Sequence, residues 1–501
     1  MELGKDNKLY VVGENPSTGT RLATLSNTNT PNPVNWNSNA LAVGYNYVYS
    51  NYFGGISNNL LKLYPLPDQI DGMDYTAHFT TDPECCIAYT SFDVEADKNN
   101  QEYTGTATWS AGATNNPFGS VSGIVTVRDK LVIKQGANIT INSMTFEFAV
   151  GARLIVENGA RLTINGTTLT VYSDCGGNAL MWQGVEVWGI GTGTFQAAVS
   201  GKFIAQNYSV IEHAIEGAVN FNHAANPSYA NNGGIIQATT GTKFRNNVKD
   251  VVFNAFQSVF NGNPYNDQSY FNDVTFITNA SLNDPTYNNS ITHASLNEVT
   301  GINFTGCDFE NTDVAGTTYP YLNRGQGILT YNSKFTVNAR CLTLTIPCTG
   351  FDESNFTNLT EGIVALNTVR TQVAFVNKSN FNNNFKSIYI FNMEAAKITE
   401  NDFDIGASVS TNFSYGLYLN NCSGYIVENN NLTTTYGGYV GVYVNNSGTA
   451  ANEIYRNNFS NLIVGSQAAS TNGDNMGNGV GLEFRCNTYE SIVDYDILIS
   501  S

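Results

Sequence analysis

A phrase of alternating apolar and polar residues recurs along residues 353–464. Each copy holds a small polar residue or Asn, a large apolar residue, a short polar run and a brief segment of β-branched or aromatic residues. The large apolar residues follow one another at steps of 25, 22, 29 and 27 residues and are Phe356, Phe381, Phe403, Leu432 and Phe459. Imperfect self-similarity with a period of about 20 to 50 residues indicates a stack of structural repeats.

The content of each repeat indicates short β-strands. Segments that alternate apolar with other residues over four or five positions are too short for helices, and examples are 362–366, 387–390, 416–419 and 441–444. Asn, Gly, Ser and Thr, which favour turns and left-handed backbone, stand between them. Coils of about 22 residues with two or three strands each, stacked on one another, predict an all-β fold of the parallel β-helix type.

The many Asn residues fit this architecture. Equivalent residues of successive coils lie about 4.8 Å apart, so Asn side chains can hydrogen-bond to one another in ladders while Phe, Ile and Val stack inside. Disordered low-complexity sequence is the alternative interpretation of the Asn runs. The regular interleaving of apolar residues favours the β-helix.

The pattern divides the chain at about residue 120. Residues 1–120 contain strand candidates at 8–12, 45–49 and 91–94 but no clean repeat, so they predict a cap, incomplete coils or a small separate β domain. Short alternating strands at 138–141, 153–156 and 161–164 then follow Gly-Ala pairs, and Gly136 and Gly159 lie one coil of 23 residues apart. We predict an N-terminal β-rich region at 1–120 and a β-helix at 121–501.

The coils are longer in the middle of the chain, at about 255–350. Phe244 and Phe276 are 32 residues apart, and Phe276 and Phe309 are 33 apart. Loops at 263–267 and 283–287 are expected to project from these coils. Insertions in repeat folds collect on one face and often carry binding, so a ligand surface is expected there.

Composition and charge narrow the function. Hydrophobic residues make up 42% of the 501 residues, while charged residues make up 13% against a usual value of about 25%. The formal net charge is −18 and no basic run exists to neutralise phosphates, which argues against nucleic acid and anionic membrane surfaces. The first residues lack the apolar run of a signal peptide, and no stretch of about 20 apolar residues predicts membrane insertion.

The eight Cys residues form no CxxC pair and no cluster with His, which disfavours a zinc site. Cys341 and Cys348 are close enough in sequence for a local disulfide. Cys307 and Cys422 belong to strand-turn phrases, where core thiols are favoured over bridges.

Three segments, 182–189, 233–247 and 484–489, carry a resemblance that covers roughly 115–501. They resemble the right-handed parallel β-helix surface proteins of Bacteroidota, which the type IX secretion system exports. The resemblance implies a right-handed helix and an extracellular, cell-envelope or filamentous protein. The chain departs from that family in lacking a signal peptide and a C-terminal sorting domain, which favours a truncated or processed form.

Candidate catalytic groups are sparse, although parallel β-helices include polysaccharide hydrolases and lyases, which need grouped carboxylates or a base. The tripeptide 311–313 matches a polygalacturonase-like motif without its partner motifs, so a loop role is favoured. The carboxylates Asp352, Glu353, Asp402 and Asp404 are expected beside turns, in water.

The remaining candidates also have favoured structural interpretations. His213 is expected on a strand face, not as a general base. The turn at 472–475 is a weak Ca²⁺ candidate because it lacks a full set of oxygen ligands. Trp182 and Trp188 would share one face of an unbroken strand, where core packing is favoured over a carbohydrate platform. No catalytic, cofactor-binding or metal residue is therefore assigned.

The sequence favours a non-enzymatic extracellular structural or adhesive protein, a rigid rod that displays loops or assembles into a surface layer or filament. Self-association, or a polysaccharide or cell-surface partner, would fit this function. The alternative is a carbohydrate-binding or polysaccharide-cleaving β-helix. Clustered carboxylates in one lateral groove would favour the alternative, and a groove of Asn, Thr and apolar residues would favour the rod.

Overall fold

The computed structural model describes residues 2–3, 9–15, 19–26, 35–42 and 100–500, except 119–122, 173–179, 226–230, 314–319, 344, 371, 410–411 and 475–479. The chain forms two compact units, Met1–Thr80 and Thr81–Ser501. Four antiparallel strands are described in the first unit: β1 (Glu2–Leu3), β2 (Leu9–Asn15), β3 (Gly19–Ser26) and β4 (Asn35–Ala42). The strand candidate at 8–12 overlaps β2, and those at 45–49 and 91–94 lie outside the described residues.

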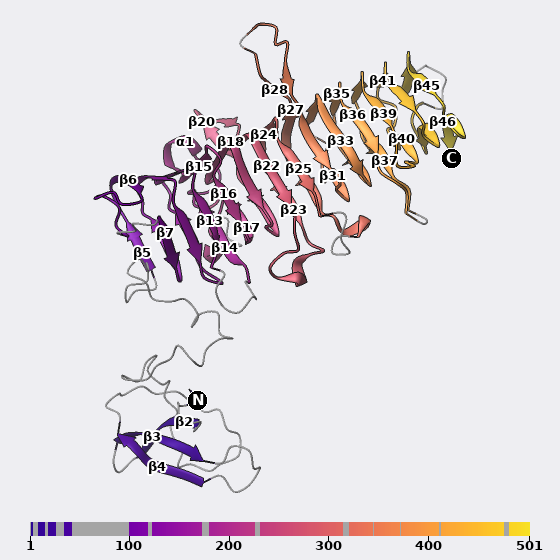
Figure 1. Cartoon of the computed structure of the whole chain (residues 1–501). Helices are drawn as coiled ribbons and strands as arrows, with labels where there is room; N and C mark the ends of the chain where they lie inside the picture. Colours follow the sequence, from indigo (N-terminus) through magenta and orange to yellow (C-terminus); the bar gives the residue numbers. More distant parts are fainter. Residues whose placement is uncertain are drawn as a thin grey trace. The chain divides into compact units, whose positions relative to one another are not determined.

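The second unit is a right-handed parallel β-helix whose coils stack along one axis (Figure 1). One wall, sheet A, has 14 parallel strands. They are β5 (Asn100–Tyr103), β8 (Lys130–Ile133), β11 (Arg153–Val156), β14 (Trp182–Val187), β17 (Ala214–Val219), β19 (Lys249–Phe253), β23 (Thr292–Asn297), β26 (Gln326–Tyr331), β31 (Glu361–Leu366), β34 (Lys386–Phe391), β37 (Tyr415–Asn420), β40 (Val440–Asn445), β43 (Val464–Ala469) and β46 (Tyr495–Ser500).

The other two walls, sheets B and C, are joined because β18 (Ile235–Arg245) and β22 (Tyr270–Thr278) run through the corner between them. Sheet B also contains β6 (Thr106–Ser110), β9 (Asn138–Asn142), β12 (Arg161–Asn165), β15 (Lys202–Gln206), β24 (Thr300–Thr305), β27 (Lys334–Asn338), β32 (Ala374–Asn377), β35 (Lys397–Thr399), β38 (Ile426–Glu428), β41 (Asn452–Tyr455) and β44 (Leu482–Arg485). Sheet C also contains β7 (Ile124–Val127), β10 (Thr145–Phe148), β13 (Thr168–Val171), β16 (Val210–Glu212), β25 (Asp308–Asn311), β30 (Ser354–Thr357), β33 (Ser379–Asn384), β36 (Asp402–Ile405), β39 (Asn431–Thr433), β42 (Asn458–Ser460) and β45 (Thr488–Glu490).

Short elements interrupt the coils at a few corners. They are the helix α1 (Gln196–Val199), the 3-10 turns η2 (His223–Ala225), η3 (Pro285–Tyr287) and η4 (Tyr321–Asn323), and the antiparallel pairs β20 (Ser258–Phe260) with β21 (Asn263–Tyr265) and β28 (Arg340–Cys341) with β29 (Phe351–Asp352). The first described coil strands, β5 and β6, pair with β8 and β9 and precede residue 121, where the sequence pattern placed the start of the helix.

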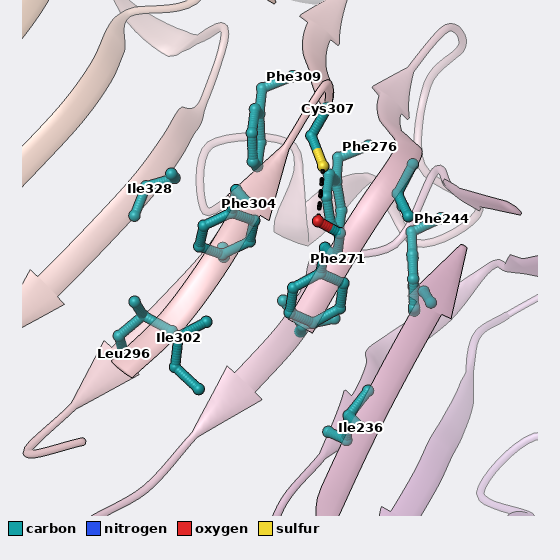
Figure 2. Close-up of a cluster of buried hydrophobic side chains, with 14 of the residues drawn as sticks. Ile236, Phe244, Phe271, Phe276, Leu296, Ile302, Phe304, Cys307, Phe309 and Ile328 are labelled. Carbon is teal, nitrogen blue, oxygen red and sulfur yellow. Dashed lines mark hydrogen bonds between the residues drawn. The ribbon is translucent and has the colours of Figure 1, made fainter. Parts of the chain in front are cut away.

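The repeat alignment read from the sequence is confirmed residue by residue. The five aligned apolar residues pair directly across β30, β33, β36, β39 and β42. The ladder continues towards the N-terminus through Phe309, Phe276 and Phe244 (Figure 2). Ring centroids of successive Phe residues from Phe244 to Phe403 lie 4.7–5.3 Å apart, so the core of sheet C is one aromatic stack.

Glycines in sheet A make room for this stack. A Cβ added to Gly362 would lie 3.2 Å from the Phe381 ring, and one added to Gly441 would lie 2.7 Å from the Phe459 ring. Both would also meet a backbone oxygen at 2.5 Å. The strand-opening glycines of the repeat phrase are therefore required by close packing across the core.

Asparagine ladders form as predicted, and one of them is buried. Asn401, Asn430 and Asn457 each donate a side-chain hydrogen bond to the next Asn of the ladder, which ends at Asn487, with distances of 2.8–3.1 Å. The first three are 0–1% exposed. Each also donates to a backbone carbonyl of the preceding coil, so the ladder satisfies buried backbone groups at the corner between sheets B and C.

Candidate functional site

A chain of five alternating charges lies on the outer side of sheet A. It runs from Arg153 on β11 through Glu186 on β14, His223 in η2 and Glu216 on β17 to Lys249 on β19. Strand register brings Arg153 and Glu216 to the two sides of Gly184, and it pairs Glu216 with Lys249. Because side chains alternate along a strand, these residues point away from the core.

His223 bridges the two carboxylates. Its Nδ1 lies 2.9 Å from Glu186 Oε1, and its Nε2 lies 2.8 Å from Glu216 Oε2. Arg153 Nη1 lies 2.5 Å from Glu186 Oε1, and Lys249 Nζ lies 3.2 Å from Glu216 Oε1. A single network thus joins side chains from β11, β14, β17 and β19 with one from η2.

The network holds His223 as an imidazolium. Hydrogen bonds to Glu186 and then to Glu216 raise the pKa of His223 to about 9. Burial alone would favour the neutral form of Glu186, but hydrogen bonds from His223 and Trp188 and the charge of Arg153 outweigh it and lower the pKa of Glu186. Burial is likewise outweighed at Glu216 by His223 and Lys249, so the pKa of Glu216 is also lowered.

Trp182, which opens β14, and Trp188, which directly follows it, do not share a face, which corrects the sequence prediction. Gly184 has φ +106°, and the pairing of β14 with β17 shifts register between Gly184 and Val185. This bulge reverses the alternation after it. Trp182 is fully buried and stacks on Phe148 at 4.2 Å, as predicted for core packing. Trp188 turns outward, where its Nε1 donates to Glu186 Oε2 at 3.0 Å.

A second charged group lies around Arg340 at the edge of sheet C. Its guanidinium reaches Asp273 at 2.8 Å and Asp352 at 2.6 Å. Asp308 accepts a 2.7 Å hydrogen bond from Asn355 of the next coil. Burial, opposed by that hydrogen bond, raises the pKa of Asp308. The arrangement joins the base of the β28–β29 loop to the coils.

The polygalacturonase-like tripeptide 311–313 begins at Asn311, the last residue of β25. Asn311 is fully buried, donates to the Arg324 carbonyl at 3.1 Å and accepts from the Asp313 backbone N–H at 3.0 Å. Its side chain therefore ties the end of β25 to Asp313 and Arg324. Asp402 accepts from Asn431, and Asp404 accepts from the backbone and side chain of Thr435, so this carboxylate pair is bonded to the next coil.

The three described histidines have different partners and lie at different places in the fold. His213 occupies the corner between β16 and β17 with φ 58°, not a strand face as predicted, because the chain turns there into the next coil. His293 is 1% exposed and pairs with the equally buried Asp250 at 2.6 Å. His78 lies outside the described residues.

Metal-binding geometry is not seen in the described part of the chain, where no three His, Cys, Asp or Glu side chains are grouped to hold an ion. At the turn 472–475, the Asn472 Oδ1 accepts from the Ser447 N–H at 2.9 Å. Asn475 of that turn lies outside the described residues.

The cysteines follow the prediction where the structure describes them. Cys341 and Cys348 form a disulfide that closes the β28–β29 loop, and Figure 1 shows this loop standing out from the coils. Cys307 and Cys422 are buried core thiols, and Figure 2 shows Cys307 donating to the Phe271 carbonyl. Burial raises the pKa of Cys422 to about 11, so its thiol stays protonated.

The long middle coils carry insertions, as predicted. The predicted loop at 263–267 overlaps β21, the second strand of the β20–β21 hairpin, and the residues of β21 are all exposed. The loop at 283–287 contains η3, which Asp284 caps by accepting from the Thr286 N–H at 3.0 Å.

The Glu186–His223–Glu216 network was not predicted from the sequence. Both glutamates stand at outward-facing positions of the apolar–polar alternation in consecutive strands, and this pattern could have identified them.

No helix in the described part of the chain is long and apolar enough to cross a membrane.

No protein family and no curated protein matches the sequence. Among solved structures, the mannuronan C-5 epimerase AlgE4 A-module of Azotobacter vinelandii is 12% identical, with 79% of this chain and 91% of that chain covered and a TM-score of 0.32. The periplasmic alginate epimerase AlgG is 10% identical, with 80% and 84% covered and a TM-score of 0.29. The Streptococcus pneumoniae surface protein and adhesin PfbA is 10% identical, with 81% and 92% covered and a TM-score of 0.29.

Proposed function

We propose that the β-helix is a non-enzymatic structural or adhesive rod that works outside the cell or on its surface. It would display loops or assemble into a surface layer or filament. One observation carries this proposal: outward-facing carboxylates are bonded to cations or amides of neighbouring coils. Such pairs are Arg153–Glu186, Lys249–Glu216, Lys386–Glu361, Lys378–Glu400, Asn355–Asp308 and Asn431–Asp402.

These ties have a mechanical and a chemical consequence. Each joins one coil to the next and so resists bending or slipping of the stack. A carboxylate engaged in this way is also less available as a general acid or nucleophile, which polysaccharide cleavage requires.

The disulfide supports an extracellular place of action. Cys341 is exposed and Cys348 lies in the same projecting loop. Disulfides persist in oxidising compartments and are rare in reducing ones. Membership of the type IX-secreted surface proteins of Bacteroidota is part of the proposal and depends on the resemblance of 182–189, 233–247 and 484–489.

Electron microscopy and a degradation assay test the proposal together. Purified protein is expected to form regular filaments or sheets, or to coat a cell surface, and to leave pectin and alginate intact. Dispersed monomers that shorten pectin or alginate chains would overturn it.

A polysaccharide-cleaving enzyme is the second candidate, and the Glu186–His223–Glu216 network is the observation that favours it. Two carboxylates and a protonated imidazole lie together on an outer face, beside the indole of Trp188. His223 could donate a proton to a leaving group, and a glutamate could act as base. If a polysaccharide is cleaved, Glu216→Gln and His223→Gln should each lower kcat at least a hundredfold, whereas Glu400→Gln, in an exposed pair, should not.

A further inference from the structure

Two insertions, from coils that are separated by one other coil, build one surface feature on the β-helix. The first, residues 189–200, contains α1, and the second, 254–269, contains the β20–β21 hairpin. The Val259 N–H donates to the Thr194 carbonyl at 3.0 Å, and the Gly193 N–H donates to the Gln257 carbonyl at 3.0 Å. The hairpin therefore packs on the α1 loop and does not stand free.

Gln196 locks the two insertions together. Its side chain is fully buried and donates to the Gly233 carbonyl at 3.1 Å and to Asp267 Oδ2 at 2.9 Å. Its Oε1 accepts from the Gln268 N–H at 2.7 Å. Asp267 also accepts from the Ser269 N–H at 2.8 Å, so one buried amide and one buried carboxylate fix the base of the hairpin.

The locked insertions present three aromatic rings. Phe195 lies 4.7 Å from Phe260 and 5.9 Å from Tyr265, centroid to centroid, in tilted and edge-on contacts. Phe260 is 45% exposed and Tyr265 is 46% exposed. Large apolar side chains held at the surface by dedicated polar contacts indicate a binding function.

The two segments that carry the rings are uncharged and rich in amides. Residues 189–200 and 254–266 contain no Asp, Glu, Lys or Arg. Asn261, Asn263 and Asn266 are exposed beside the rings. The one acidic group of the hairpin, Asp267, is buried.

We propose that Phe195, Phe260 and Tyr265 form a binding platform for an uncharged polysaccharide. The apolar C–H face of a sugar ring packs on an aromatic ring, and amides can both donate to and accept from sugar hydroxyls. The patch carries no cation to attract a polyuronate, and the net charge of −18 repels one. Three rings are also too small a patch for a stable protein interface, which needs about 1,000 Å².

The Gln196–Asp267 lock gives the platform its affinity. A hairpin that is already ordered loses little conformational entropy when a ligand binds. This inference names the ligand class of the proposed adhesive surface and so rests on the proposed function. The experiment below measures glycan binding and not assembly. The platform can therefore fail its test while the structural rod stands, and the reverse also holds.

Calorimetry on the full chain tests the platform with cellohexaose, xylohexaose, mannohexaose and hexamannuronate. At least one uncharged hexasaccharide is expected to bind, and Phe260→Ala/Tyr265→Ala should weaken it tenfold or more. Phe413→Ala is the matched control, because Phe413 is 54% exposed in a different loop, and should change affinity less than twofold. Gln196→Ala should weaken binding severalfold without removing a ring.

Thermal unfolding of each variant checks that the β-helix is intact. Failure of all three uncharged sugars to bind would overturn the proposal. So would preferential binding of hexamannuronate, or an unchanged affinity in Phe260→Ala/Tyr265→Ala.

Discussion

At the scale of single residues, the outer side of sheet A shows how neighbouring coils change the chemistry of a side chain. His223 belongs to a loop, and the carboxylates of two strands hold its charge. The buried pair His293–Asp250 occupies a register position that glycines fill in other coils, at Gly217 and Gly327. In both cases at least one partner, Glu186 or Asp250, comes from the preceding coil, so residue-level chemistry depends on stacking.

The raised pKa of His223 predicts a pH dependence. Because the folded pKa of about 9 exceeds the unfolded value of 6.5, the stabilisation is fully present below about pH 6.5 and is lost as pH rises through 9. The ring is 33% exposed, so solvent screening leaves a contribution of roughly 1–2 kcal/mol. NMR titration of the imidazole should give a pKa near 9, and His223→Gln should flatten the fall in thermal stability over this window. A titration midpoint near 6.5 would contradict the bridged geometry.

At the scale of elements, corners and insertions decide what each strand can do. The buried Asn ladder closes corners that would otherwise leave backbone carbonyls unsatisfied. The bulge at Gly184 reverses which side chains after it face outward. The disulfide loop and the β20–β21 hairpin extend two of the longer coils.

Replacing an Asn of the buried ladder should cost far more than replacing an exposed one. Asn430→Ala removes an acceptor for Asn401 and a donor to the Ile398 carbonyl, leaving buried polar groups unpaired, at a cost of about 3 kcal/mol. Asn458→Ala removes one hydrogen bond at an exposed ladder position and should cost under about 1 kcal/mol. Chemical denaturation of the two variants provides the comparison, and equal losses would show that the buried ladder adds nothing special.

Reduction of the Cys341–Cys348 disulfide should loosen only its own loop. The bridge closes a short segment outside the coils, with a sequence separation of 7. Cys341→Ser/Cys348→Ser should increase proteolytic cleavage within 342–350 while the melting temperature of the β-helix changes by less than about 2 °C. Cleavage inside the strands of neighbouring coils would contradict this view.

At the scale of the β-helix as a whole, the described coil strands pair with those of neighbouring coils, so stability is shared locally along the stack. The core is linear, and its buried side chains do not converge on one central point. One continuous cluster of buried side chains runs from Trp109 to Leu462. A defect in one coil should therefore stay close to where it is made.

Gly441→Ala tests this locality. The added Cβ would meet the Gly465 carbonyl and the Phe459 ring, so overpacking should cost about 1–3 kcal/mol. Hydrogen exchange should rise in β37–β45 and remain unchanged in β9–β13. Gly350→Ala, in the exposed disulfide loop, is the control and should leave exchange in the coils unaltered. A uniform rise along the whole helix would show that it unfolds as one unit.

The sequence by itself determined the length of each coil and which residues form its strands and its core. Phe356, Phe381 and Phe403 could be aligned from spacing alone because each strand alternates with a fixed period and each coil repeats the same local choices. The local disulfide was suggested by the closeness of Cys341 and Cys348 in sequence, and the core thiols by the strand-turn phrases that hold Cys307 and Cys422. Only the tertiary structure decided which outward side chains meet. Insertion lengths and the Gly184 bulge set the register between coils, and that register brings His223 between two glutamates, turns Trp188 outward and gathers three aromatic rings on interlocked loops.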